Sequence, residues 1–319
     1  MGFTLQSDDQ YNAPCDGVFG FSDGTYDYLA GGWAGGTVTY DVCFRSSNVG
    51  VTFASHSTAP HAFHTGATCV VDGIAYLVGG DLYNKSRDGD WIRTSSKFEA
   101  GAWSQIAANP GIENRCLAAL VFLNDNFYLI GGQAEANKTG TIYDTVLRSD
   151  DGLLTFDVIL ADTKTQGFRG GLNWGGVVVY RNLIWKICGG IYSGGLLERE
   201  YDTSIFSSPD GITWTYRGAF RGIGRHFHQC VVHNDKIYVF NGFSGAYTGA
   251  NVLSSGNLTD YWTIEMLASG KIVQTYKGTT DWGAHHALTC WTNASGIMMF
   301  GGSGEVSGNP TQECWLFTE

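Results

Sequence analysis

A pair of glycines that closes an apolar run recurs along the whole chain and constrains the fold more than any other feature. The runs end at Gly31-Gly32, Gly79-Gly80, Gly131-Gly132, Gly189-Gly190, Asn241-Gly242 and Gly301-Gly302. The first members of successive pairs are spaced by 48, 52, 58, 52 and 60 residues. Because a period near 50 residues is typical of folds that repeat one small sheet, the chain is expected to contain six similar β units.

A second landmark follows each of the first five pairs. An aromatic residue lies downstream of each pair, with a serine seven residues before it: Ser46 and Phe53, Ser96 and Trp103, Ser149 and Phe156, Ser207 and Trp214, Ser255 and Trp262. The intervening residues are polar and contain glycine, as hairpin turns do. Each repeat is predicted to hold four strands, a to d. Strand b ends at the glycine pair, strand c ends near the serine and strand d carries the aromatic. A Tyr-Asp pair opens strand c in three repeats: Tyr40-Asp41, Tyr143-Asp144 and Tyr201-Asp202.

The two ends of the chain have complementary patterns. Cys314-Trp315-Leu316-Phe317 resembles a strand c with no strand d after it, and Phe3-Thr4-Leu5 resembles a strand d with no strand before it. An N-terminal strand that completes the sixth unit would remove the free edge of an open sheet. The prediction is an all-β, six-bladed β-propeller with four antiparallel strands per blade. Its ring is closed by the N-terminal strand, and residues 1–319 form a single domain.

Glycine pairs after an apolar strand, followed by an aromatic, resemble the kelch repeat over essentially the whole chain. The chain departs from the kelch pattern at Asn241, which replaces the first glycine of its pair, and in a longer spacing between tyrosine and tryptophan. The turn from Ser208 to Trp214 is similar to a shortened Asp-box, the turn that sialidase-type propellers repeat. These resemblances imply an architecture and not an activity.

Composition excludes several classes of partner. The net charge is -11 and the pI is about 5.1, so neither nucleic acid nor an anionic membrane surface is an expected partner. No apolar run is long enough for membrane insertion, and the N-terminus lacks the features of a signal peptide. We expect a cytoplasmic or virion-associated protein, or a domain excised from a larger surface protein.

The eight cysteines are scattered singly without a CxxC pair. They are interpreted as buried small side chains, although disulfides stay open.

The candidate site lies on the face where the b–c and d–a connections emerge, since propellers of the kelch family usually bind ligands there. Alignment of the repeats on the glycine pairs and on Cys69, Cys230 and Cys290 places an arginine or histidine at the start of strand a in four of them, and Arg169 lies a few residues before the equivalent place in a fifth. The b–c connections add aromatic residues. The predicted ligand-binding residues are His64, Arg115, Arg169, Arg225, His285, Trp33, Tyr83, Tyr192 and Tyr247.

Guanidinium groups suit a carboxylate or phosphate, and aromatic rings suit stacking on a sugar. The alternative is that these arginines and histidines pair with Asp and Glu of neighbouring blades. His226 and His228 are interpreted as structural, since no carboxylate stands at a convincing metal-ligand spacing. No metal and no cofactor is predicted, and no G-x-S-x-G turn or P-loop occurs.

Three functions fit this pattern. The favoured one is a lectin-like or receptor-binding propeller that recognises a glycan, another small acidic ligand or a receptor protein, for instance as a phage or viral adhesin. The second is an enzyme acting on an acidic sugar, which the kelch and Asp-box resemblances imply because sialic acid epimerases and sialidases share such propellers. The third is a kelch module for protein–protein interaction. The residues favour binding over catalysis and leave enzymatic activity open.

Overall fold

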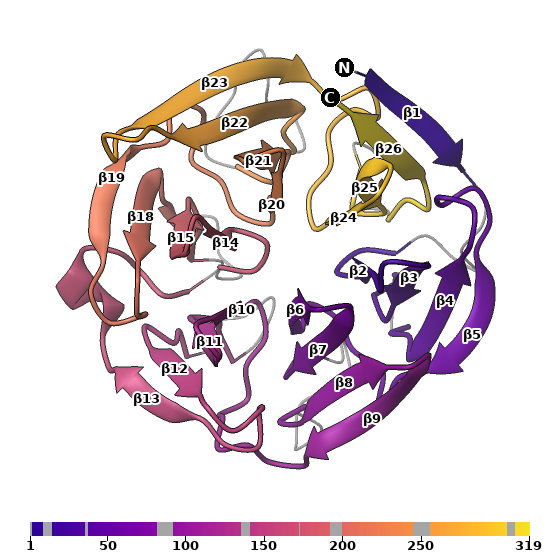
Figure 1. Cartoon of the computed structure of the whole chain (residues 1–319), viewed down its shortest axis with the longest axis horizontal. Coiled ribbons are helices and arrows are strands. Elements are labelled where there is room, and N and C mark those ends of the chain that lie inside the picture. The colour runs from indigo at the N-terminus through magenta and orange to yellow at the C-terminus, as the bar shows by residue number, and fades with distance from the viewer. Residues whose placement is uncertain are drawn as a thin grey trace.

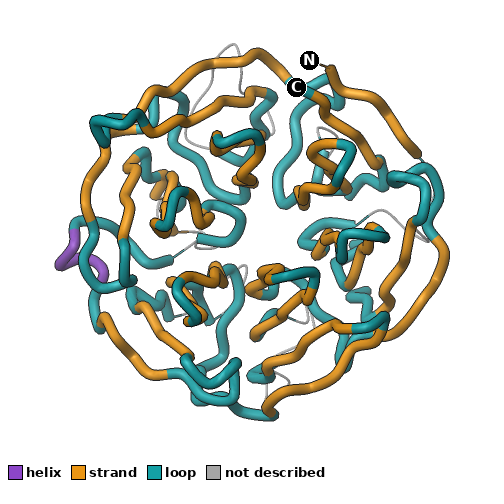
Figure 2. Tube along the Cα trace, viewed as in Figure 1, coloured by secondary structure: helices purple, strands orange, loops and turns teal. Residues whose placement is uncertain are grey.

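The computed structural model describes residues 2–8, 15–35, 38–81, 92–134, 141–171, 173–191, 200–244, 256–304 and 310–319. Its strands form six four-stranded antiparallel sheets arranged as blades around one axis (Figure 1), which confirms the six-bladed β-propeller. In each sheet the first strand lies nearest the axis and the last lies at the rim. The tube in Figure 2 shows η1 (Thr163–Gln166) outside the ring of strands, at its rim.

The first three blades use consecutive strands. Blade 1 is β2 (Phe19–Ser22), β3 (Asp27–Ala30), β4 (Val42–Ser46) and β5 (Ala54–Thr58). Blade 2 is β6 (Ala67–Val71), β7 (Ile74–Val78), β8 (Ser95–Glu99) and β9 (Ala102–Ala107). Blade 3 is β10 (Ala119–Leu123), β11 (Asn126–Ile130), β12 (Val146–Ser149) and β13 (Asp157–Leu160).

The other three blades add a small side sheet and a strand from the opposite end of the chain. Blade 4 is β14 (Val177–Tyr180), β15 (Leu183–Ile187), β18 (Ser204–Ser208) and β19 (Thr215–Ala219), with β16 (Gly190–Ile191) and β17 (Glu200–Tyr201) paired beside it. Blade 5 is β20 (Gln229–His233), β21 (Lys236–Phe240), β22 (Asp260–Met266) and β23 (Ile272–Thr279). Blade 6 is β24 (Thr289–Asn293), β25 (Gly296–Phe300), β26 (Cys314–Thr318) and β1 (Gly2–Ser7).

The N-terminal strand closes the ring as predicted. Strand β1 pairs antiparallel with β26, and Phe3 stands opposite Phe317. The Phe3 ring also meets Tyr261 and Trp282 edge-on, with centroids 5.3 Å away in both cases. Since Tyr261 belongs to blade 5, this strand both completes one blade and packs on the next, and the two chain ends lie side by side (Figure 1).

The glycine pairs bind each blade to the following one. The second residue of each pair, which in blade 4 is Gly189 because the pair there is Cys188-Gly189, has a φ between 91° and 120°, a conformation that glycine adopts without the strain of a side chain. This conformation aims its N–H at the neighbouring blade. The N–H groups of Gly32, Gly80, Gly132, Gly189, Gly242 and Gly302 donate to the carbonyls of Phe63, Arg115, Gly171, Arg225, His285 and Cys15, at 2.6–3.1 Å. The chain of bonds runs through every blade and returns to the first.

Blade 4 departs from the glycine pattern read from the sequence. Its equivalent pair is Cys188-Gly189 and not Gly189-Gly190, because the Cys188 N–H donates to Ser204 at the start of β18. In the other blades the first residue of the pair likewise donates to the first residue of the third strand or to the residue before it. Cys188 has a φ of 54°. The prediction was therefore displaced by one residue in this repeat.

The aromatic residue that follows the serine by seven positions does not occupy the same place in every blade. In blades 1, 3 and 4 the aromatic stands just before strand d, whereas Trp103 lies within β9 and Trp262 lies within β22, the third strand. Assigning Trp262 to strand d was wrong, because the hairpin of blade 5 turns only after Met266. The turn of blade 4 has the expected chemistry. The Ser208 hydroxyl accepts from Gly211 N–H at 2.8 Å, and the Asp210 carboxylate accepts from Thr213 N–H at 2.8 Å.

The hydrophobic core of the described residues is divided among the blade junctions. Six buried clusters each combine side chains of two adjacent blades. Between blades 4 and 5, for example, Trp185 and Ile187 pack with Ile237 and Val239, all at 0% exposure. Trp214, an aromatic of the serine-to-aromatic spacing, packs between blades 3 and 4. Apolar burial therefore holds the blades together as well as each sheet.

Replacement of Gly302 by alanine tests how closely the end of strand b packs on the connection that leads into strand a of the same blade. A Cβ at Gly302 would stand 2.8 Å from the His286 carbonyl and 3.0 Å from the Leu288 nitrogen, so the backbone must shift. Gly24 has nearly the same φ, 90° against 91°, but a Cβ added there would meet nothing within 4 Å. Gly24→Ala should cost about 1–2 kcal/mol of unfolding free energy from backbone conformation alone. Gly302→Ala should cost at least about 2 kcal/mol more, since overpacking adds to that strain. Urea unfolding measures both, and equal losses would contradict the close approach of Gly302 to the backbone that leads into β24.

Candidate functional site

Short bridges between the d–a and b–c connections extend the inner strands at one face of the ring. Each joins a residue that precedes strand a to one that follows the glycine pair: Asp16 to Trp33, His64 to Asp81, Cys116 to Gln133, His226 to Phe243 and His286 to Ser303. These bridges show the true register of the repeats. Arg115, Arg225 and His285 are equivalent, but their counterpart in blade 2 is Phe63, and His64 aligns with Cys116, His226 and His286.

The error of one residue arose from the cysteines used as markers. In blade 2 Ala67 stands opposite Val78, the residue before the glycine pair, and in blade 5 Gln229 stands opposite the equivalent Phe240. Cys230 is therefore equivalent to Thr68 and not to Cys69. His64 does not belong to the same ring of positions as the two arginines.

Arg225 is fully buried and bound to its own blade. Its two terminal nitrogens donate to the Asp260 carboxylate at 2.7 and 2.8 Å, and one also donates to the Asn241 carbonyl at 2.9 Å. Its Nε donates to the Ile223 carbonyl at 3.0 Å. Burial alone would raise the pKa of Asp260, but the charge and hydrogen bonds of Arg225 outweigh it, so this pKa is lowered. A ligand would have to displace a bidentate ion pair to reach this guanidinium.

Arg115 occupies the equivalent position in blade 3 with different partners. Its guanidinium donates to the Gly131 carbonyl at 2.9 Å and to Glu113 at 2.7 Å, and it lies over the Tyr143 ring at 4.3 Å. The side chain is only 1% exposed. Like Arg225, it joins the start of strand a to the end of strand b and to the b–c connection.

The histidines of the predicted set are also buried. His64 lies 3.0 Å from the Asp16 carboxylate, whose other oxygen accepts from the Ser303 hydroxyl at 2.6 Å, so the three residues link blades 1, 2 and 6. Burial lowers the pKa of His285 to about 4, so the ring is neutral near pH 7 and supplies no positive charge. Trp33 is half-buried, with its ring centroid 6.3 Å from that of His64.

The centre of this face is closed by backbone and apolar side chains. At each blade junction an N–H of one blade donates to a carbonyl of its neighbour, at 2.7–3.2 Å: Gly17 to Ala287, Thr65 to Gly17, Leu117 to Thr65, Trp174 to Leu117, Cys230 to Gly175 and Ala287 to Phe227. Cys116, Leu117, Trp174 and Ala287 pack together inside this belt with Phe227, and we call these five residues the plug. The Trp174 indole N–H donates to the Gly66 carbonyl at 3.2 Å, which links blade 4 to blade 2.

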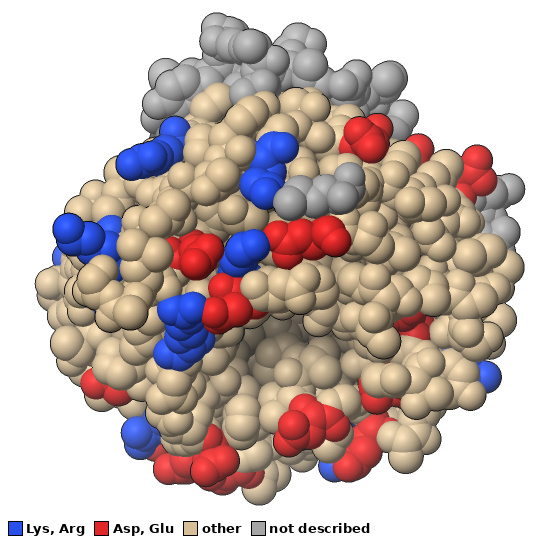
Figure 3. Space-filling model, turned by 45° about the horizontal axis from the view of Figure 1, so that its top comes forward, with Lys and Arg blue, Asp and Glu red and all other residues tan. Residues whose placement is uncertain are grey.

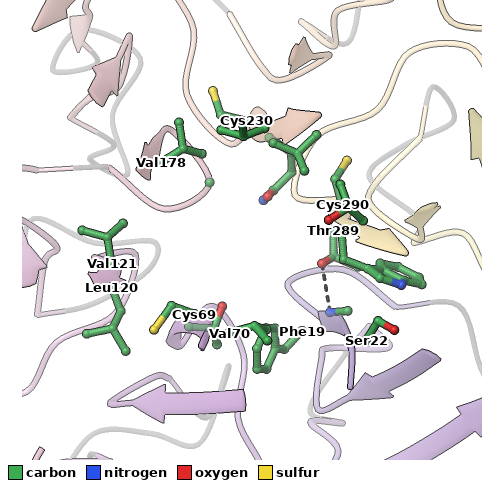
Figure 4. Close-up of a pocket in the computed structure, with 18 of the residues that line it drawn as sticks. Phe19, Ser22, Cys69, Val70, Leu120, Val121, Val178, Cys230, Thr289 and Cys290 are labelled. Atoms are coloured by element: carbon green, nitrogen blue, oxygen red, sulfur yellow. Dashed lines mark hydrogen bonds between the residues drawn. The ribbon is translucent and has the colours of Figure 1, made fainter. Parts of the chain in front are cut away.

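Beyond the plug the channel opens to the opposite face. Its cavity has a volume of about 900 Å³ and is lined by all six innermost strands, as the side chains in Figure 4 show. The lining extends to turns between the first and second strands, including Asp23, Asp72 and Ala294. Figure 3 shows the surface hollowed near the middle of the ring. His64, Arg115, Arg225 and His285 do not line this cavity.

A groove of about 400 Å³ lies on the predicted face, and we call it the Tyr201 groove. Its lining residues are Lys164, Gly167, Phe168, Arg169, Tyr201 and Asp202. The first four belong to the d–a connection between β13 and β14 and the last two to the b–c connection of blade 4. Among the described residues of the predicted set, Arg169 is the one that lines it, and the side chain of Arg169 is 34% exposed.

Ring packing and ion pairs position the groove residues. Tyr201 stacks on buried His226 with centroids 4.8 Å apart and planes 12° apart. Asp144 pairs with Arg169 at 3.4 Å and with Lys164 at 3.2 Å. Asp202 pairs with the buried ammonium group of Lys186. Burial would raise the pKa of Asp202, but Lys186 and Ser204 hold it below its ordinary value, so Asp202 is ionised near pH 7.

Sequence reasoning overlooked most of this groove. Tyr201-Asp202 was visible as a recurrent opening of strand c, but nothing in the sequence brought it near Lys164 or Phe168. Tyr83, Tyr192 and Tyr247 fall outside the described residues. Among the described side chains no group of three His, Cys, Asp or Glu could hold a metal ion. No helix in the described part has the length and apolar character needed to span a membrane.

Comparison with protein-family models and with curated proteins finds no match for this chain. The evidence for the six-bladed fold is therefore the pairing of its strands into six sheets. The kelch and sialidase-type resemblances remain interpretations of the repeats.

Asp260→Asn tests whether Arg225 is a structural residue. This variant leaves a buried guanidinium without its countercharge, so it should lose about 3–5 kcal/mol of unfolding free energy. The control is Glu99→Gln, which breaks the exposed pair of Glu99 with Lys97 and should leave stability nearly unchanged. Urea unfolding at pH 7 measures both. Similar stabilities for the two variants would mean that Arg225 is not held by Asp260.

The same pair predicts a dependence of stability on pH. Because the folded pKa of Asp260 is lowered, its stabilising effect is present above the unfolded value of about 4 and is lost as pH falls through the folded value. The difference in unfolding free energy between wild type and Asp260→Asn should therefore shrink below about pH 4. A difference that is constant from pH 7 to pH 3 would contradict an ionised Asp260 in the folded protein.

Proposed function

We propose that this propeller is a carbohydrate-binding module and that the Tyr201 groove is its binding site. The observation that carries the proposal is an aromatic ring beside a short row of hydrogen-bonding groups, all lining one groove on the face of the b–c and d–a connections. A pyranose has an apolar face that packs on an aromatic ring and hydroxyl groups at its edge. Tyr201 supplies the ring, and Lys164, Arg169 and Asp202 supply the donors and acceptors.

The packing behind Tyr201 supports a binding role for its ring. One face is covered by His226, which is fully buried and also stacks near Phe243 at 5.5 Å. A ring held from behind loses little conformational entropy when a ligand binds, which favours affinity. The side chains of Lys164 and Arg169 stay 51% and 34% exposed beside it.

The charges of the groove favour hydroxyl-rich ligands over strongly anionic ones. Two cations, Lys164 and Arg169, share the carboxylate of Asp144, and Asp162 lies 3.7 Å from Lys164. The positive charge at this place is therefore largely neutralised. Because Arg115 and Arg225 are also paired and buried, they give little support to an anion site at the centre of this face. We propose a neutral glycan as the ligand, with sialylated glycans as the alternative.

Tyr201→Ala tests the proposal on an array of neutral and sialylated glycans. The wild type should bind a neutral glycan, and removal of the stacking ring should weaken that binding by about tenfold or more. Tyr201→Phe should keep most of the affinity, since it keeps the ring. The matched control is Tyr216→Ala on β19, because Tyr216 is 58% exposed and does not line the groove.

Three outcomes decide between functions. Binding that is lost in Tyr201→Ala and kept in Tyr216→Ala supports the proposal. No binding to any glycan, or binding that is unchanged in Tyr201→Ala, overturns it. If incubation with the protein changes the proportions of the anomers or epimers of sialic acid in NMR spectra, beyond the change in a blank without protein, the acidic-sugar enzyme is favoured instead.

A further inference from the structure

The central cavity is a second, independent feature that the proposed function does not use. It lies on the far side of the plug from the face of the b–c connections. Trp174 and Gly175 stand at its closed end, and the turns that follow β2, β6 and β24 surround its opening. Its volume of about 900 Å³ is at the upper end of the range of small-molecule pockets.

The walls combine apolar side chains with backbone hydrogen-bonding groups. Every innermost strand is an edge strand of its sheet, so it offers N–H and C=O groups that its own sheet does not pair. The Gly20 N–H, for example, donates to the Thr289 hydroxyl of blade 6 at 2.9 Å (Figure 4). Val70, Val178 and Leu120 supply apolar surface between such groups, as the figure also shows. An organic molecule with an apolar body and a few polar atoms fits walls of this kind.

The charges of the cavity have one sign. Among the described residues that line it, Asp23 and Asp72 are the only charged side chains. They lie in the turns that follow β2 and β6, and a Cβ on Gly73 would stand 3.0 Å from the Asp23 carbonyl, so the two turns touch. Burial would raise the pKa of Asp23, but the N–H groups of Tyr26 and Thr25 and the Tyr28 hydroxyl lower it, which keeps this carboxylate ionised. One side of the opening is therefore negative.

We infer that the central cavity binds an organic cation whose apolar body enters the channel and whose charged end stays beside Asp23 and Asp72. The plug limits the depth of insertion because the belt of hydrogen bonds and the buried Trp174 ring close the other end. An anion of the same size meets no cationic side chain among the described lining residues and faces two carboxylates. The cavity thus selects ligands by charge and by apolar volume together.

Two dansyl compounds test the inference, since they share a fluorophore and differ in charge. Dansylcadaverine is the cationic probe and dansylglycine is the anionic one. Dansylcadaverine should bind with increased, blue-shifted emission, because the fluorophore enters an apolar site. Dansylglycine should bind at least about tenfold more weakly, as two nearby carboxylates repel its charge.

Two variants with matched controls locate the site. Val70→Trp fills the cavity and should abolish binding, whereas Val158→Trp on β13 changes a 57% exposed residue outside the lining and should not.

Asp72→Asn removes one charge and should weaken dansylcadaverine binding by about three- to tenfold. Its control is Asp125→Asn, in the corresponding turn of blade 3, since Asp72 and Asp125 both have positive φ, 50° and 60°. Asparagine tolerates this conformation, so both variants should fold.

The inference is overturned if dansylcadaverine does not bind, if dansylglycine binds equally well, or if Asp72→Asn has no more effect than Asp125→Asn. Binding that survives Val70→Trp in a folded protein also overturns it. Glycan binding through the Tyr201 groove should be unchanged in Asp72→Asn, so the proposed function and this inference are tested independently.

Discussion

The structure depends on the hydrogen bonds that join neighbouring blades where the inner strands end. At each junction a backbone N–H in a left-handed conformation reaches the carbonyl of the next blade, and the series closes through Gly302 and Cys15. Glycine fits this position because a Cβ would meet the adjacent backbone, as it would at Gly302. These bonds set the spacing of neighbouring blades, and the six apolar clusters fill the space between them.

The same inter-blade bonds explain the role of the buried arginines. Arg115 and Arg225 belong to the position whose carbonyl accepts the glycine bond, and their side chains turn back along their own blades. They tie the d–a connection to strand b and the b–c connection. A charged side chain in such a place needs its partners within the fold, because burial without them would cost several kcal/mol. Arg115 and Arg225 therefore act as joints between connections.

The sequence predicts the fold well because the repeat is carried by backbone chemistry. The spacing of the glycine pairs predicts the blades, and the complementary patterns at Phe3 and Phe317 predict the closing strand. The site is harder to predict because it depends on loops with different lengths. An error of one residue placed His64 at the arginine position, and the strand register shows that the two positions differ. The Tyr201 groove joins η1 to the b–c connection of blade 4, a contact between segments with no shared motif.

The two faces of the ring offer different chemistry. The face of the connections is closed at its centre by the plug and carries the Tyr201 groove, while the opposite face opens into the cavity between the innermost strands. Hydrogen–deuterium exchange with and without a saturating glycan from the array tests most directly which part binds the ligand. We predict slower exchange confined to the connection that contains residues 163–169 and to residues 200–204, with β6, β10 and β20 unchanged. Slower exchange in those innermost strands, or none near Tyr201, would contradict the assignment of carbohydrate recognition to this groove.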